Sequence, residues 1–121
     1  MNPVQIGSLL VGGGHPLVFI AGPCVIESTQ HAVETALGIR EIARRCGVPL
    51  IFKASYDKAN RTSIKSYRGP GREAGLKILQ SVKQQFDVPV LSDVHEVEQV
   101  AEAAEVLDVL QIPAMLSRQT D

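Results

Sequence analysis

The sequence contains no tryptophan, and aromatic residues account for only 4% of its 121 residues. This scarcity argues against a nucleic-acid surface that stacks bases on aromatic side chains. A strong excess of one charge is also missing, because 12 basic and 13 acidic residues leave a formal net charge of −1. Any cationic site must therefore be local. Long apolar runs are absent too, so we expect no membrane-spanning segment, which needs roughly 20 apolar residues.

Cysteine is almost as rare: only Cys24 and Cys46 occur, and they do not form a CxxC motif. Two isolated cysteines are typical of free thiols in a reducing compartment rather than of a disulfide scaffold. The first residues, MNPVQIGSLL, lack the basic segment and long apolar stretch of a signal peptide. We therefore expect a cytoplasmic protein with the size of one ordinary domain.

What the sequence does contain is a regular alternation of two kinds of apolar segment. Short runs rich in Val, Ile, Leu and Phe predict strands buried on both faces, as in parallel sheets, at 17–22, 49–54, 88–94 and 106–112. Helical spacing predicts helices at 29–46, 72–86 and 96–104. The segment before them, VQIGSLLVGGGHP, predicts a small hairpin around Gly12–Gly14.

The first predicted helix has clear boundary signals. Ser28 and Thr29 are alternative N-caps, and Gly47 ends the helix. Its predicted apolar face is made of Val33, Ala36, Leu37, Ile42 and Cys46.

Strands that alternate with helices predict an α/β fold with right-handed crossovers and a parallel sheet. Both an open doubly wound sheet and a (β/α)8 barrel fit this order. A complete barrel takes roughly 250 residues, so four strands amount to about half of one. The final segment PAMLSRQTD places Thr120 or Asp121 as the N-cap of a further helix, so we expect a longer protein.

Polar residues follow all four predicted strands at their carboxyl ends, where ligands bind in both architectures. They are Cys24, Glu27, Lys53, Lys58, Asn60, Arg61, Asp93, His95, Gln111 and Arg118. This one-sided distribution predicts a polar pocket.

Individual members of this set have competing interpretations. Lys53, in an apolar strand, forms either a structural ion pair with Asp93 or a ligand for an anion or carbonyl. The loop from Lys58 to Ser63 is either a solvated basic loop or a phosphate site. The stretch RGPGREAG also precedes a helix start, but it matches no phosphate-loop pattern.

For each of the two cysteines, packing in the protein interior is one interpretation. Cys24 looks buried between Pro23 and Val25, and core packing competes with a role as metal ligand or nucleophile. His95 and Glu27 are its candidate partners, although the chain shows no metal-binding spacing. Cys46 is expected to pack on the apolar helix face.

Four motifs in order resemble the N-terminal half of the 3-deoxy-D-manno-octulosonate 8-phosphate synthases, from about residue 18 to residue 121. They are AGPCVIES, FKASYDKANRTSIKSYRGPG, SDVHE and LQIPAMLSRQTD. The related 3-deoxy-D-arabino-heptulosonate 7-phosphate synthases share a GPC-type first strand end but have a Lys-Pro-Arg pattern where this chain has KANR. The resemblance therefore favours the octulosonate family, with the heptulosonate enzymes as the alternative.

The resemblance implies that residues 1–121 are the N-terminal half of a single (β/α)8 barrel whose bottom is closed by the hairpin. Such enzymes are usually tetrameric. They condense phosphoenolpyruvate with arabinose 5-phosphate for lipopolysaccharide synthesis. We expect the 121 residues alone to be inactive, since half of the site is missing. The competing class is a non-enzymatic α/β module that self-associates through its open sheet edges.

The motif match also implies roles for single residues. Phosphoenolpyruvate would contact Lys53, Lys58, Asp93 and Gln111, and arabinose 5-phosphate would contact Asn60, Arg61 and Thr62, where relatives commonly have serine. Lys58, Asn60 and Asp93 would be catalytic, and His95 would line the pocket. Arg118 would reach a sugar phosphate in a neighbouring subunit. Cys24 resembles the class that binds a divalent metal, whose other ligands would come from later strand ends.

Overall fold

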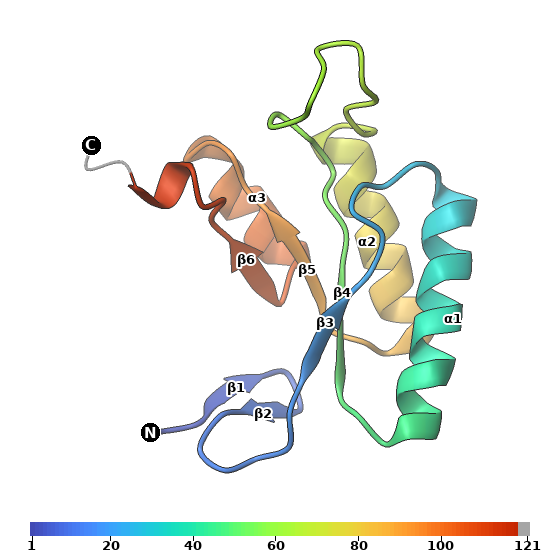
Figure 1. The fold of residues 1–121 in the computed structure, drawn as a ribbon, viewed down its shortest axis with the longest axis vertical. Helices are drawn as coiled ribbons and strands as arrows, with labels where there is room; N and C mark the ends of the chain where they lie inside the picture. The colour runs from blue at the N-terminus through green and yellow to red at the C-terminus, as the bar shows by residue number, and fades with distance from the viewer. Residues whose placement is uncertain (119–121) are drawn as a thin grey trace.

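The computed structural model describes residues 1–118, so the N-cap predicted at Thr120 or Asp121 lies outside the described residues. The elements follow the predicted order. They are β1 (Val4–Ile6), β2 (Leu9–Val11), β3 (Phe19–Ala21), α1 (Thr29–Cys46), β4 (Leu50–Lys53), α2 (Arg72–Phe86), β5 (Val90–Asp93), α3 (Glu98–Val106), β6 (Val109–Gln111) and a short 3-10 helix, η1 (Leu116–Arg118) (Figure 1). Helix α3 begins two residues later than predicted. The α/β class is confirmed.

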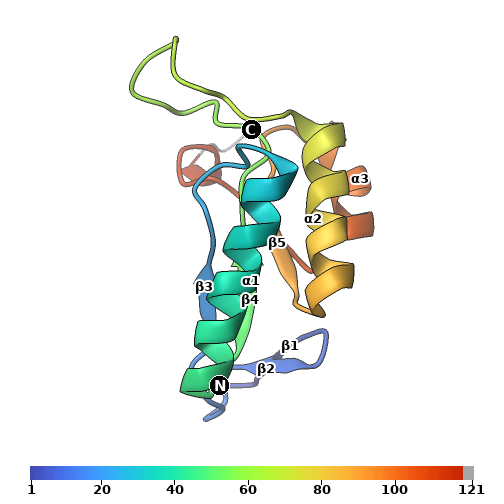
Figure 2. The ribbon, with the colours of Figure 1, turned by 90° about the vertical axis from the view of Figure 1, so that its right-hand side faces the viewer.

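The four main strands form a parallel sheet in the order β3-β4-β5-β6. Its register pairs Ile20 with Ile51, Lys53 with Leu91, and Asp93 with Gln111. Helix α1 packs on β4, α2 on β5 and α3 on β6, and neighbouring helices contact one another (Figures 1 and 2). The carboxyl ends of all four strands therefore meet at one edge of the sheet.

Burial differs between the central and the outer strands. Phe52 in β4 and Val90 in β5 are fully buried, as predicted, whereas Phe19 and Ile20 in β3 are 48% and 54% exposed. Within residues 1–118, β3 and β6 each pair on one side only. The prediction that all four strands are buried on both faces is therefore wrong for β3, and also for β6, whose residues are only half-buried. Both are edge strands among the described residues, so no strand covers their outer side.

The predicted hairpin is present, but its turn is elsewhere. Ile6 pairs with Leu9 across Gly7-Ser8, and Gly7 has the positive φ of 56° that this tight turn uses. The three glycines at 12–14 follow β2 and lead the chain towards β3. Predicting the turn at the glycine triplet was wrong, since a two-residue turn already closes the strand pair.

Both ends of α1 carry the expected caps. The Ser28 side chain accepts a hydrogen bond from the backbone N–H of His31 at 3.0 Å, which decides between Ser28 and Thr29. Gly47 ends the helix in the left-handed conformation with φ 67°.

The buried face of α1 differs from the prediction. Ala32, Ala36 and Ala43 are its buried residues. Leu37 and Ile42 are about half exposed, and Cys46 is exposed too. Helical spacing alone favours the bulky residues, but small alanines allow α1 to lie close to its neighbours. Only part of the predicted face, chiefly Ala36, is therefore correct.

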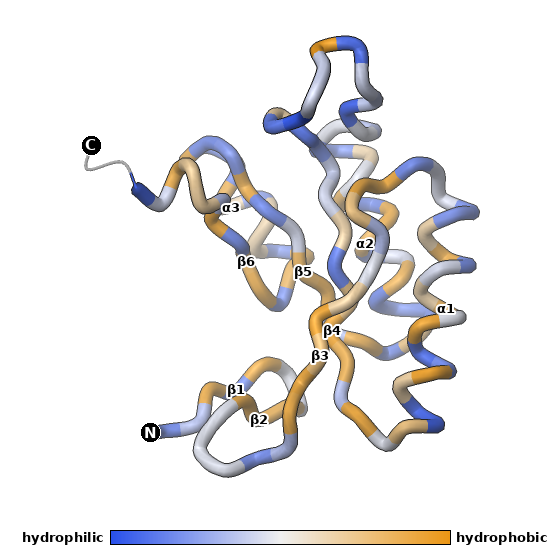
Figure 3. Tube along the Cα trace, viewed as in Figure 1, coloured by the Kyte–Doolittle hydropathy of each residue, from blue (hydrophilic) through white to orange (hydrophobic). Residues whose placement is uncertain are grey.

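Hydrophilic residues concentrate in the long connection between β4 and α2, at the opposite end of the sheet from the hairpin (Figure 3).

Among the described residues, none of the helices combines the length and the apolar character that crossing a membrane requires.

Candidate active site

A cavity of about 590 Å³ opens at the carboxyl ends of β4, β5 and β6. Five of the predicted site residues line it: Lys58, Asn60, Asp93, His95 and Gln111. Lys58 and Asn60 come from the loop after β4, His95 follows β5, and Asp93 and Gln111 are paired ends of adjacent strands. The predicted convergence of polar side chains from successive strand ends is thus observed for these five residues.

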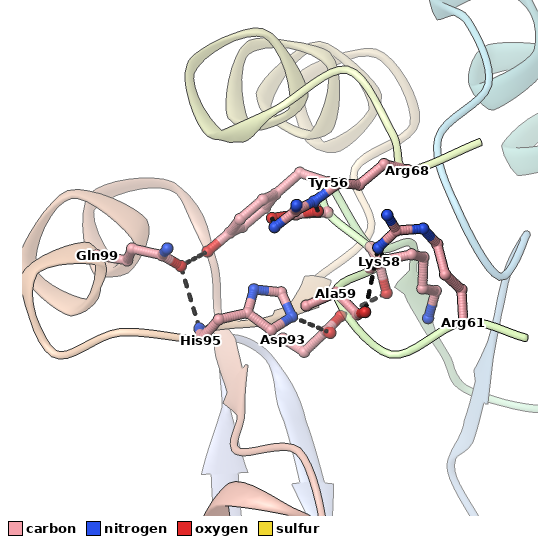
Figure 4. A network of polar contacts seen from close by, with 10 residues as sticks. Tyr56, Lys58, Ala59, Arg61, Arg68, Asp93, His95 and Gln99 are labelled. Carbon is pink, nitrogen blue, oxygen red and sulfur yellow. Dashed lines mark hydrogen bonds and ion pairs between the residues drawn. The ribbon is translucent and has the colours of Figure 1, made fainter. Parts of the chain in front are cut away.

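Asp93 is the most buried charged residue of this group, with 6% of its surface exposed. Its carboxylate accepts a hydrogen bond from the Ser55 hydroxyl. It also pairs with His95 Nε2 at 2.9 Å (Figure 4). Burial raises the pKa of Asp93, but the Ser55 hydrogen bond, a backbone hydrogen bond and the charges of Lys53 and Lys58 together lower it below its ordinary value. The carboxylate is therefore ionised at neutral pH.

Lys53 does not form the structural ion pair with Asp93 that was one of its two interpretations. The sheet register places Lys53 opposite Leu91, two residues before Asp93, and His95 is the side chain that pairs with this carboxylate. Lys53 is half-buried and acts on Asp93 only through its charge. It does not line the cavity.

Three buried polar residues of the site were missed from the sequence: Ser55, Tyr56 and Gln99. Tyr56 donates its hydroxyl to Gln99 Oε1 at 2.8 Å, and its ring meets the His95 ring edge-on with centroids 6.1 Å apart. Burial, followed by the nearby charge of Asp93, raises the pKa of Tyr56 to about 12. Helical spacing could have indicated the burial of Gln99. It lies four residues before Ala103, the other buried residue of α3, and therefore on the same face of the helix.

The other predicted sugar-phosphate ligands lie outside the cavity. The Arg61 guanidinium donates to the backbone carbonyls of Lys58, Ala59 and Ile64 at 3.1–3.2 Å, so it holds its own loop together (Figure 4). Thr62 is exposed in the same loop, and Arg118 is exposed on η1. None of the three faces Asp93 or His95 across the cavity.

The whole chain matches a known family. A profile described as the DAHP synthetase I family matches residues 2–121. The chain belongs to the DAHP synthetase I family. The curated relatives that match the chain carry the name 2-dehydro-3-deoxyphosphooctonate aldolase, which is KDO 8-phosphate synthase. This name belongs to the octulosonate branch of the family. The resemblance predicted from the motifs is therefore confirmed.

Three of these relatives show how much of the family pattern the chain contains. The proteins of Trichlorobacter lovleyi, Geotalea uraniireducens and Fusobacterium nucleatum are 60%, 58% and 56% identical over 118, 121 and 121 residues. The matches cover 98–100% of this chain but only 43–44% of the relatives. The chain thus spans less than half the length of the curated relatives it matches.

In this member of the DAHP synthetase I family, Cys24 is exposed and not buried as expected, and Cys46 is exposed as well. The backbone carbonyl of Cys24 accepts a hydrogen bond from Ser55 N–H at 3.3 Å, so the chain after β3 is held against β4 while the thiol stays outside the core. Within residues 1–118 no group of three or more His, Cys, Asp and Glu side chains could hold a metal ion. The described residues alone therefore do not make a metal site.

The glycines of RGPGREAG have a packing explanation. A Cβ atom at Gly69 would lie 2.5 Å from the carbonyl oxygen of Tyr56, and one at Gly75 would lie 2.2 Å from Tyr56 Cβ. Gly71 N–H donates to the same Tyr56 carbonyl at 3.0 Å. These glycines therefore allow α2 and its entry loop to approach Tyr56, beside the cavity.

Proposed function

We propose that the whole protein condenses phosphoenolpyruvate with D-arabinose 5-phosphate and water to give 3-deoxy-D-manno-octulosonate 8-phosphate and inorganic phosphate. The observation that carries this proposal is the cavity at the carboxyl ends of three consecutive parallel strands. A lysine, an asparagine, an ionised aspartate, a histidine and a glutamine line it. The name of the curated relatives supports the same reaction.

The architecture that we propose is a single (β/α)8 barrel of which residues 1–121 form the N-terminal half. The strand order β3-β4-β5-β6 and the row of helices that pack on consecutive strands support it. Exposed Phe19 and Ile20 on β3 support it too, because a further strand there would cover them. The hairpin β1–β2 lies at the end of the sheet opposite the loop after β4, where it would close the barrel bottom (Figure 1).

The proposed reaction explains the residue types. Carbon 3 of the enol ester forms a bond to the aldehyde carbon, and water adds to carbon 2. The bond between carbon 2 and the phosphate oxygen then breaks, which releases inorganic phosphate and leaves the ketone. Negative charge develops on the aldehyde oxygen, so a cation held nearby lowers the barrier more than it strengthens ground-state binding. We assign this role to Lys58, between the two substrates. Asp93 and Gln111 complete the phosphoenolpyruvate site together with Lys53.

Two phosphorylated substrates need separate cationic sites that hold them in reacting geometry. We propose Asn60, Arg61 and Thr62 for arabinose 5-phosphate, with Arg118 contributing to a sugar-phosphate site of a neighbouring subunit. The three backbone carbonyls use three of the five N–H groups of Arg61. Nε, which has no hydrogen-bond partner among residues 1–118, and the second N–H of Nη2 remain as donors for the phosphate. A homotetramer and a cytoplasmic location stay predictions from the resemblance.

We also propose Cys24 as the one metal ligand on this chain, with the remaining ligands on later strand ends. Its exposure leaves the thiol available to a metal ion whose other ligands would lie outside the described residues. When bound, a divalent ion would polarise the aldehyde oxygen or orient water.

The experiment is a turnover assay on the full-length protein, with phosphoenolpyruvate and added divalent metal. An eight-carbon product requires a five-carbon aldose phosphate beside the three-carbon enol, whereas the heptulosonate product requires a four-carbon one. We expect phosphate release and octulosonate formation with arabinose 5-phosphate, and much slower turnover with the four-carbon substrate. No release with arabinose 5-phosphate would overturn the proposal.

The 121-residue chain provides the second arm of the same assay. We expect it to be inactive, since half of the proposed site lies outside it. Size-exclusion chromatography of this 13.0 kDa chain tests the competing idea of a self-associating module. The non-enzymatic module would be favoured if the 121-residue chain forms multimers without turnover and the full-length protein is inactive too.

A further inference from the structure

We infer that Gln99 is a positioning residue, which acts through His95 to hold the Asp93 carboxylate at the wall of the cavity. The functional part of this inference rests on the proposed reaction. Gln99 lies in the first turn of α3 with only 9% of its surface exposed. A buried amide without partners is costly, so its contacts show what the residue does.

The orientation of the Gln99 amide follows from its partners. Gln99 Oε1 lies 3.1 Å from the backbone nitrogen of His95 and 2.8 Å from the Tyr56 hydroxyl. A backbone N–H only donates, so the atom facing His95 must be the amide oxygen. The Tyr56 hydroxyl then donates to the same oxygen, and its raised pKa of about 12 keeps that proton in place at neutral pH.

His95 is therefore held on three sides. Gln99 fixes its backbone, the Tyr56 ring meets its imidazole at an interplanar angle of 89°, and Asp93 Oδ2 pairs with Nε2 at 2.9 Å. An ionised carboxylate only accepts, so Nε2 carries the proton. Nδ1, the other ring nitrogen, is buried and lacks a hydrogen-bond partner among residues 1–118.

The contacts form one continuous series that begins at Tyr56 and ends at Ser55, both just after β4. Figure 4 shows the part from Tyr56 through Gln99 and His95 to Asp93. Tyr56 and Gln99 lie at one end, and Ser55 holds the second oxygen of Asp93 at the other. Within residues 1–118 no hydrogen bond joins Gln99 to Asp93, so the path from Gln99 to the carboxylate passes through His95. A Gln99 with a merely structural role would hold the backbone before α3 in the same way, and the experiment must separate these two roles.

The experiment is a double-mutant cycle in the full-length protein with Gln99→Met and His95→Ala, measured with phosphoenolpyruvate and arabinose 5-phosphate. Met matches the length of Gln but accepts no comparable hydrogen bond. We expect Gln99→Met to lower kcat by about 10-fold to 100-fold, the cost of a misplaced catalytic group, with little change in either KM. In the His95→Ala background the same substitution should have no further effect on kcat.

Two matched variants complete the design. Gln99→Glu keeps an acceptor oxygen for His95 N–H and should recover most of kcat. Lys83→Met removes a part-buried ion pair with Asp108 far along the sheet, and should lower thermal stability while leaving kcat unchanged. Equal losses of kcat from Gln99→Met in both backgrounds, or no loss in the wild-type background, would overturn the inference.

A readout independent of turnover separates this inference from the proposed reaction. Ring-15N-labelled histidine reports which nitrogen of His95 carries the proton. We expect the Nε2–H form in the wild type and a mixture of forms in Gln99→Met. If the wild type shows no synthase turnover, the proposed function fails, and the labelled ring alone decides: a change on Gln99→Met supports the positioning role, and an unchanged ring overturns it.

Discussion

Both Nε and Nη2 of Arg68 donate to the carboxylate of Asp57, at 2.6 and 3.1 Å. Beside this pair, the backbone N–H of Lys58 donates to the carbonyl of Arg68 at 2.7 Å. The two ends of the 57–68 loop are thus joined by a two-pronged ion pair and a backbone hydrogen bond. Because Lys58 and Asn60 enter the cavity from this loop, its closure positions them.

Loss of the ion pair between Arg68 and Asp57 should increase the mobility of the 57–68 loop, with little effect on the global stability of the protein. Arg68→Met removes the ion pair, which is largely exposed and therefore contributes little to global stability. We expect severalfold faster trypsin cleavage after Lys58, Arg61 and Lys65, and a higher KM for arabinose 5-phosphate in the full-length protein. The control is Lys77→Met, which removes the exposed ion pair with Glu73 on α2. Unchanged cleavage in Arg68→Met would show that the ion pair does not hold the loop.

Two helical glycines should respond in opposite directions to the same substitution. Gly75→Ala places a Cβ 2.2 Å from Tyr56 Cβ, so α2 must shift, and we expect a loss of about 1–3 kcal/mol in the free energy of unfolding. Gly38→Ala in α1 meets nothing within 4 Å and should gain about 0.5–1 kcal/mol. Urea-induced unfolding of both variants tests this difference. A stabilising Gly75→Ala would contradict the packing account.

The lowered pKa of Asp93 predicts a pH dependence of stability. A carboxyl whose pKa is lower in the folded state stabilises the protein above its ordinary pKa of 3.8, and loses this effect as the pH falls through the lowered value. The stability advantage of the wild type over Asp93→Asn should thus be constant above about pH 5 and shrink below 3.8.

Ser55→Ala is the matched variant for this pH series. It removes the hydroxyl that stabilises the ionised Asp93, so the pKa of Asp93 should rise and the loss of stability should begin at higher pH. Urea unfolding at a series of pH values measures all three proteins. A difference between wild type and Asp93→Asn that does not vary with pH would rule out this titration.

The two exposed cysteines provide an internal comparison for the proposed metal. Cys24→Ala in the full-length protein should lose most of its bound divalent metal, because a thiolate is a strong ligand that alanine cannot replace. Cys46→Ala should retain the wild-type metal content. Elemental analysis after dialysis measures both. Equal metal content in the two variants would exclude Cys24 as a ligand.

Features that depend on one segment of the chain were predictable from the sequence, whereas features that depend on contacts between distant segments were not. Apolar runs predicted each strand of the main sheet, and helical spacing predicted each helix that packs on it, because each of these signals lies within one segment. The one-sided placement of polar residues likewise predicted that Lys58 and Asp93 would line the same cavity. In contrast, neither the alanine face of α1 nor the exposure of Phe19 was predictable, since both depend on which neighbours are present.

The site shows the same division. Residue order alone brought the loop after β4 to the carboxyl edge of the sheet, because parallel strands place successive ends together. Only the tertiary structure showed that Arg61 binds the carbonyls of its own loop, and that Gln99 links Tyr56 to His95. These contacts are set by distances of a few ångströms between side chains and backbone, some from segments over 40 residues apart. Spacing along the chain determines the elements, whereas packing between them decides which polar groups meet.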